Sequence, residues 1–257
     1  MRKILLYSTS LFVLLLDANA RAQSIDSLII QGKTFITDGV EGWEAAPLQK
    51  ARAHFERLLT SKQHEALLHY YIGYCDYRLT IYYQQKTNQE LLKKHLEEGI
   101  IHLEAAVKLN NKFAEAYALL SSCYGQKIAM APMLGMTLGP RSGMTMQTAL
   151  QLAPNNPRVI LLDAIGTYYK PSMFGGSKEK ALTGFKRAAE LFDQEKIGDP
   201  LQPDWGHPEA YAWLGVAYID KNDLAKARTV LERALVIAPN YGWVKHQLYP
   251  QAAAAKP

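Results

Sequence analysis

The sequence predicts an all-α protein in which about five helix pairs stack into a solenoid and a short helix closes the C-terminal end. Apolar residues recur at three- and four-residue spacing in two successive segments of residues 208–241, and the same arrangement returns along the chain. Because one such pair cannot bury its apolar stripe alone, neighbouring pairs must stack on it. The predicted pairs are 25–60, 64–110, 114–154, 157–193 and 208–241, and the closing helix is 242–250.

The first two helix pairs are predicted by comparing their residue types and spacing with those of the last pair. Residues 50–59 follow residues 226–235 in residue type and spacing, which places the second helix of the first pair. In the second pair, Ile72-Gly73 occupies the position of Leu214-Gly215. Residues 80–92 are predicted to form a long insertion between the two helices of this pair.

The third and fourth pairs differ from the last in their connections. Residues 114–124 repeat the first helix of the last pair, with two tyrosines at the same spacing. An expansion at residues 128–142 is predicted between the two helices of the third pair. In the fourth pair, Gly175-Gly176 permits a left-handed turn and Ser177 can cap the helix that follows.

The fifth pair carries the most complete set of local signals. Pro208 suits a first helical turn and Pro239 cannot continue a helix. Asn222-Asp223 supplies a tight turn and an N-cap between the helices, and Gly215 is small where they cross. The apolar faces consist of Leu214, Ala217 and Tyr218 in the first helix and Ala227, Val230, Leu231 and Ala234 in the second.

The spacing of these positions resembles the 34-residue tetratricopeptide repeat (TPR). Gly-Pro-Arg-Ser at 139–142, Phe-Gly-Gly at 174–176 and Trp-Leu-Gly at 213–215 are similar to segments of uncharacterised secreted bacterial TPR proteins. The resemblance implies a right-handed α-solenoid whose first helices line a concave groove. It also implies that function lies in a binding surface rather than in a catalytic cluster. The lysine and asparagine pattern by which some TPR domains clamp a terminal carboxylate is missing.

Aligned with the family, one tyrosine stripe is predicted to face the groove. Tyrosine combines a large apolar ring with a hydroxyl and suits recognition of a peptide. The alternative is that these tyrosines fill the interior of the second pair, and the sequence leaves both possibilities open. The predicted groove positions are Tyr70, Tyr74, Tyr77 and Arg78 in the second pair and Glu115 and Ser122 in the third.

The N-terminus is typical of a secretory signal. Arg2-Lys3 precedes an apolar run at residues 4–16, and Ala20-Arg21-Ala22 supplies small residues before cleavage at Gln23. The apolar run is short for a membrane span, which needs about 20 residues. We therefore expect residues 1–22 to be removed and the mature protein to be periplasmic or secreted, without a membrane-spanning segment.

Charge gives no indication of a nucleic-acid partner. The formal net charge of the full chain is +5. Loss of residues 1–22 removes three cations and one carboxylate, so it falls by two to +3. Lysine and arginine alternate with glutamate along the helices, which is typical of a solvated surface.

The two cysteines are predicted to be free. Cys75 and Cys123 follow the small residue of their first helices by two positions, as Ala217 follows Gly215. Equivalent positions on successive repeats lie about 8–10 Å apart, beyond the usual reach of a disulfide. Buried thiols that act as small apolar groups are therefore favoured.

Two residue clusters could in principle bind metal. Met130, Met133 and Met136, with Met144 and Met146 nearby, could offer thioethers to Cu(I), but methionines that fill gaps on one helical face are favoured. The segment then packs as an ordered insertion or offers an adaptable apolar patch to a partner. His95, Glu98 and His102 could share a zinc ion, but a solvated outward face is favoured. No phosphate-binding loop, His-Glu-x-x-His or Gly-x-Ser-x-Gly motif occurs, so no catalytic residue, metal or cofactor is predicted.

These observations predict a non-enzymatic periplasmic or secreted module that binds a protein or peptide in its concave groove. The alternative is an accessory subunit that presents a small molecule or metal to a transporter. A deep enclosed pocket between Tyr70 and Met146 would support that alternative, and its absence would count against it.

Overall fold

The computed structural model describes residues 24–253, which form helices and turns and no strand. The predicted signal segment, residues 1–22, lies outside the described part. Eleven α-helices follow one another along the chain. They are α1 (Ile25–Glu41), α2 (Ala45–Leu58), α3 (Glu65–Gln85), α4 (Gln89–Leu109), α5 (Ala114–Met130), α6 (Gly135–Leu152), α7 (Pro157–Tyr169), α8 (Lys178–Gln194), α9 (His207–Asp220), α10 (Leu224–Ile237) and α11 (Tyr249–Ala253).

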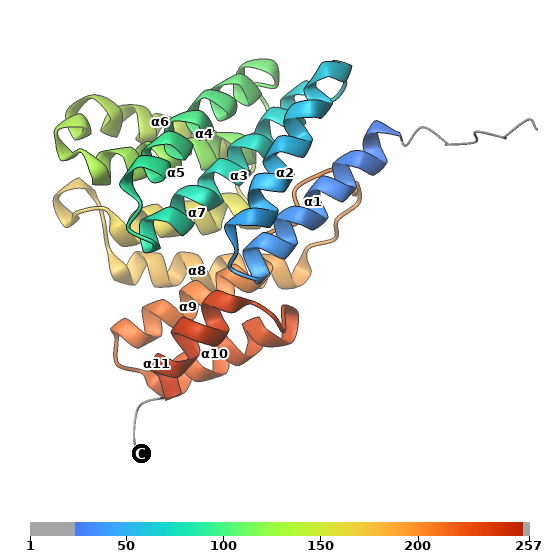
Figure 1. Ribbon diagram of the computed structural model, residues 1–257. Helices are drawn as coiled ribbons and strands as arrows, with labels where there is room; N and C mark the ends of the chain where they lie inside the picture. Colours follow the sequence, from blue (N-terminus) through green and yellow to red (C-terminus); the bar gives the residue numbers. More distant parts are fainter. Residues whose placement is uncertain (1–23, 254–257) are drawn as a thin grey trace, which may run out of the picture.

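The first ten helices form five hairpins in chain order (Figure 1). The predicted all-α solenoid is therefore confirmed. The closing element consists of a π-helical turn at Val244–Leu248 followed by α11. Within the described residues, no helix combines the length and the apolar character that a membrane crossing requires.

Two predicted insertions have a simpler form in the structure. Residues 80–92 are not a separate insertion, because α3 continues to Gln85 and α4 begins at Gln89. Residues 128–142 are also mostly helical, since α5 ends at Met130, a 3-10 turn spans Pro132–Leu134 and α6 begins at Gly135. The extra length therefore produces longer helices rather than loops.

Local chemistry fixes the helix ends. The Ser177 side chain accepts a hydrogen bond from the Lys180 amide at the start of α8, and Asp223 accepts one from the Lys226 amide at the start of α10. Gly175 has a φ of 89°, in the left-handed region, within the turn before α8. The predicted caps and the predicted glycine turn are thus present.

Small residues let the paired helices cross closely. A Cβ placed on Gly73 would lie 2.6 Å from the Leu103 side chain, and one on Gly215 would lie 2.4 Å from that of Leu231. These glycines therefore permit contacts between α3 and α4 and between α9 and α10 that alanine would obstruct. Cys75 and Cys123 are buried and free, as predicted.

Stacking is regular except at α6. The second helix of most hairpins packs on the first helix of the next. The exception is α7, which contacts the preceding hairpin mainly through α5 and makes few contacts with α6. Helix α6 consequently lies at one edge of the molecule, at the left of Figure 1. Of its 18 residues, only Ala149 is fully buried.

The two halves of the solenoid also touch each other. The rings of Trp43, after α1, and Trp243, before α11, stack with centroids 6.4 Å apart. Arg78 on α3 reaches Glu209 on α9, 131 residues later. The segment between α8 and α9, residues 195–206, runs beside α1 (Figure 1). The inner side of the superhelix is therefore occupied by the chain's own residues.

Candidate functional site

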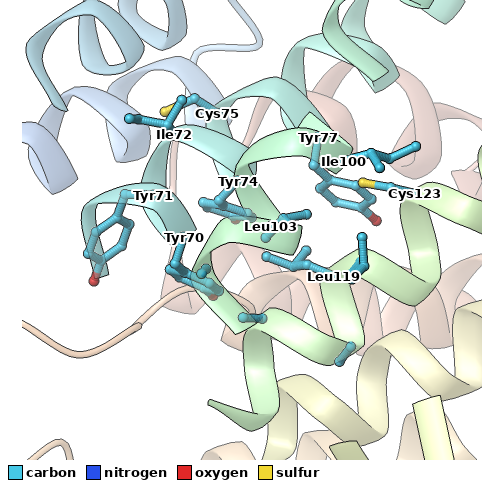
Figure 2. Packing of buried hydrophobic residues seen from close by; sticks show 14 of the residues in the cluster. Tyr70, Tyr71, Ile72, Tyr74, Cys75, Tyr77, Ile100, Leu103, Leu119 and Cys123 are labelled. Atoms are coloured by element: carbon cyan, nitrogen blue, oxygen red, sulfur yellow. The ribbon is translucent and has the colours of Figure 1, made fainter. Parts of the chain in front are cut away.

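The tyrosine stripe lies along α3 and is buried. Tyr70, Tyr74 and Tyr77 recur at helical spacing on one face, and their exposed fractions are 0%, 1% and 4%. Figure 2 shows them among Leu103, Leu119 and Cys123 of the neighbouring helices. The expectation of an open tyrosine-lined groove is not met, because these rings form part of the core.

What covers the stripe is a segment we call the strap, residues 195–206, which links α8 to α9 without helix or strand. The indole of Trp205 stacks on the Tyr74 ring with centroids 4.6 Å apart, and its Nε1–H donates a hydrogen bond of 2.8 Å to the Tyr70 hydroxyl. The Tyr71 hydroxyl donates one of 2.6 Å to the carbonyl of Leu201. The stripe thus faces the inside of the superhelix, where the strap closes over it.

Helix α1 holds the other side of the strap through Lys33. Its Nζ donates to the carbonyls of Pro200 and Gln202 at 2.6 and 2.7 Å, and it lies 3.0 Å from an Asp204 carboxylate oxygen. Lys33 is only 7% exposed, so these three oxygens replace most of the water that a lysine ammonium normally holds. The Lys33 ammonium thus holds the turn at residues 199–202 and the Asp204 carboxylate against α1.

Two arginines complete the charged groups around the strap. Arg158 on α7 binds Glu195 at the start of the strap with N–O distances of 2.5 and 2.9 Å. Arg78, predicted for the groove, is buried and donates to both carboxylate oxygens of Glu209 at 2.9 Å. Burial is the largest single influence and acts to lower the pKa of Arg78, but Glu209 and three neighbouring tyrosines together outweigh it, so that pKa lies above its usual value. Both arginines therefore carry a paired positive charge.

The remaining predicted groove residues are half-buried on α5. The Glu115 carboxylate accepts a hydrogen bond of 2.7 Å from the Asn156 side chain, and the Ser122 hydroxyl donates one of 3.1 Å to the carbonyl of Ala118. Both side chains use hydrogen-bonding groups within the solenoid. The structure therefore does not unite all six predicted positions in one open site.

No base or nucleophile is activated at the stripe. Burial raises the pKa of Tyr70, Tyr74 and Tyr77, so the phenols remain neutral at physiological pH. Burial likewise raises the pKa of the Cys75 and Cys123 thiols and disfavours the reactive thiolate. This arrangement offers stacking and hydrogen bonding rather than covalent chemistry.

A polar cluster at the interface of α2, α3 and α4 has the composition of a metal site. One ligand atom each from Asp76, His95 and Glu98 lies within 4.8 Å of the others. The expectation that His95 faces solvent is wrong, because it is 6% exposed and its Nδ1 lies 2.7 Å from the Asp76 carboxylate. Arg52 binds both Asp76 and Glu98 at 2.7 and 2.9 Å. The guanidinium already supplies the positive charge that these carboxylates require.

The third member of the predicted histidine group lies elsewhere. His102 faces His69 of α3, with the two Nδ1 atoms 2.9 Å apart. Burial is the main cause that lowers the pKa of both imidazoles. This pair is therefore favoured in its neutral form.

The methionine run is mostly exposed. Met133 and Met136, at the turn into α6, are 92% and 89% exposed, and Met130 and Met144 are also exposed. The expectation that the run fills packing gaps is wrong for these four residues, because α6 packs against α5 on one side only. Met146 alone among them is half-buried against the core.

The structure also contains a hollow that the sequence did not indicate. It has a volume of about 490 Å³ and lies between α1 and the strap, and its lining includes Thr34, Thr37 and Ile197. Tyr70 is fully buried and hydrogen-bonded to Trp205, so the pocket envisaged between Tyr70 and Met146 does not open at this tyrosine.

Sequence reasoning missed the strap because residues 194–207 fell between two predicted pairs. The available signal was Trp205 together with Pro200 and Pro203 in a link that lacks a helical pattern. A tryptophan outside every predicted apolar face needs a packing partner.

Comparison with known proteins agrees with this architecture. Residues 208–241 match the tetratricopeptide repeat family. This segment, which forms α9 and α10, is a tetratricopeptide repeat. No curated protein matches it significantly.

Two solved structures are similar to this chain. One is the HusA haemophore from Porphyromonas gingivalis, with a TM-score of 0.64 and 22% identity, over 78% of this chain and 96% of HusA. The other is TTC0263, a thermophilic TPR protein from Thermus thermophilus, with a TM-score of 0.64 and 17% identity, over 90% of this chain and all of that one. These similarities establish a shared fold.

Proposed function

We propose that this protein is a non-enzymatic, periplasmic or secreted interaction module that binds a partner protein or peptide on the inner face of its solenoid. A TPR fold is that of a protein-interaction module in general. The observation that supports the inner face is that stacked tyrosines and Lys33 there already hold a non-helical stretch of polypeptide. The proposal requires no cofactor, metal, nucleic acid or membrane-spanning segment.

Cross-linking in the export compartment tests this proposal. A photoreactive amino acid at Thr34, exposed beside the strap, should cross-link a partner that mass spectrometry can identify. Ile101 on α4 is a matched control, because it is 64% exposed and substitution there disturbs no core contact. A partner captured from Thr34 and not from Ile101 supports the inner face. The same proteins from both positions, or none from Thr34, would count against it.

Export is tested separately on the mature protein. Fractionation followed by mass spectrometry should find the chain outside the cytoplasm with Gln23 as its first residue. A cytoplasmic protein that retains residues 1–22 would refute this part of the proposal.

A second candidate function is small-ligand presentation to a transporter, favoured by the similarity to a haemophore and by the hollow beside α1. The volume of this hollow, about 490 Å³, falls within the usual range for ligand pockets. Haem titrated into the protein should then give an absorbance change that saturates at one equivalent. The variant Thr34→Trp should abolish this change, because the indole would obstruct the hollow. No saturable change in the wild-type protein would exclude haem as the ligand.

A further inference from the structure

The strap resembles a bound peptide more than an integral part of the solenoid. Residues 196–200, Gln202 and Asp204 are exposed, and the strap contains neither helix nor strand. It approaches the solenoid chiefly through Leu201, Pro203 and Trp205, which are buried or half-buried. Segments with few buried contacts open at lower free energy than the core beneath them.

The contacts divide into two kinds. Lys33 and Tyr71 bind three successive main-chain carbonyls, those of Pro200, Leu201 and Gln202. These carbonyls belong to a turn that the Gln202 amide closes by donating to the Asp199 carbonyl at 3.1 Å, so the contacts recognise the backbone of a turn whatever its side chains. Two further contacts depend on sequence, namely the Asp204 carboxylate at Lys33 and the Trp205 indole on Tyr74 and Tyr70.

We propose that the strap is an internal ligand, and that the surface of α1 and α3 beneath it receives a partner segment that forms a similar turn and then carries a carboxylate followed by an aromatic residue. This inference rests on the proposed function and names the chemistry of its partner. A tethered segment competes at an effective concentration on the order of millimolar. The strap therefore keeps the tyrosine face covered until a better-matched segment displaces it.

A synthetic peptide of residues 196–206 tests this inference directly. The receiving protein is the full chain with Leu201, Pro203, Asp204 and Trp205 all changed to serine, which removes the side-chain contacts of the internal competitor and leaves Lys33 and the tyrosines. The matched control changes Lys196 and Gln202 to serine, since both side chains are exposed in the same strap. Calorimetry measures peptide affinity, and circular dichroism confirms helical content.

We expect the four-serine variant to bind one peptide at least about tenfold more tightly than the wild-type protein or the control variant, because its internal competitor is weakened. A peptide with Asp204→Ala and Trp205→Ala should lose at least about tenfold in affinity. A folded four-serine variant that does not bind the peptide, or that binds both peptides equally, would overturn the inference.

A second variant covers the case in which the four-serine protein does not fold. Trp205→Ala alone removes the stacking on Tyr74 and should also bind the peptide more tightly than wild type. Loss of helix in both variants would show that the strap is part of the core, and would overturn the inference. The two proposals can fail separately. If a variant binds the strap peptide but the photoreactive residue at position 34 cross-links no partner in the cell, the binding surface of α1 and α3 is supported and the proposed cellular function fails.

Discussion

The buried pair between Arg78 and Glu209 gives the sharpest stability prediction. Both residues are at most 7% exposed, and one guanidinium nitrogen lies 2.9 Å from each carboxylate oxygen. Glu209→Gln keeps the shape of the side chain but leaves the Arg78 charge buried without a counter-charge. Breaking such a pair costs about 3–5 kcal/mol, against a total of about 5–15 kcal/mol for an ordinary domain. We expect the free energy of unfolding to fall by that 3–5 kcal/mol.

Urea unfolding followed by circular dichroism measures the change through the midpoint at unchanged slope. Glu179→Gln is the matched control, because it removes one carboxylate from an exposed pair with Lys221 and should not shift the midpoint measurably. The double variant Arg78→Met/Glu209→Met should recover most of the loss, since neither charge then remains buried. A loss below about 1 kcal/mol for Glu209→Gln would refute the reasoning that this pair joins the two halves of the solenoid.

Three further perturbations have expected outcomes. Gly215→Ala should destabilise the protein by roughly 1–3 kcal/mol, because an added Cβ would meet the Leu231 side chain. Gly166→Ala in α7 should stabilise it by about 0.5–1 kcal/mol, because an added Cβ there meets nothing within 4 Å. Equal shifts of the melting temperature in the two variants would contradict the close crossing of α9 and α10. The pKa of His69 and of His102 is lowered from 6.5 in the folded protein. As pH drops below about 6.5, these histidines therefore take up protons in the unfolded chain before they do so in the folded protein, and the free energy of unfolding should fall. Urea unfolding at about pH 7.5 and about pH 5 should show this fall, and His102→Asn should reduce it; an unchanged fall in that variant would refute the role of the pair. Both cysteines should resist a thiol reagent until urea unfolds the chain, and labelling of the native protein would contradict their burial.

The solenoid could be predicted because its determinants are local. Helical spacing of apolar residues, caps such as Ser177 and Asp223, and glycines at 73 and 215 each act within one hairpin. The burial of the cysteines followed from the same repeat spacing. The predicted helix boundaries were less accurate at residues 80–92 and 128–142, where insertions were expected. There α3 continues to Gln85 and α6 begins at Gly135, because helical spacing does not fix helix length.

The candidate site could not be predicted to the same degree, because its contacts are distant in sequence. Periodicity placed Tyr70 and Tyr74 on one face of α3 but could not identify what covers that face. The answer is Trp205, 135 residues after its hydrogen-bond partner Tyr70. His95 was misplaced for a related reason, since its burial depends on Asp76 and Arg52 from other helices. The methionines were misplaced because helical spacing cannot show that α6 lacks a neighbour on one side.

Native-state hydrogen exchange of the wild-type protein tests the central claim most directly, since a surface covered by a displaceable strap requires the strap to open on its own. We predict that the amides of Leu201 and Gln202 exchange through local openings that do not depend on low concentrations of denaturant. Amides within α3, such as that of Leu79, should exchange only through global unfolding, with a strong dependence on denaturant. Equal protection and equal denaturant dependence in the strap and in α3 would contradict the account.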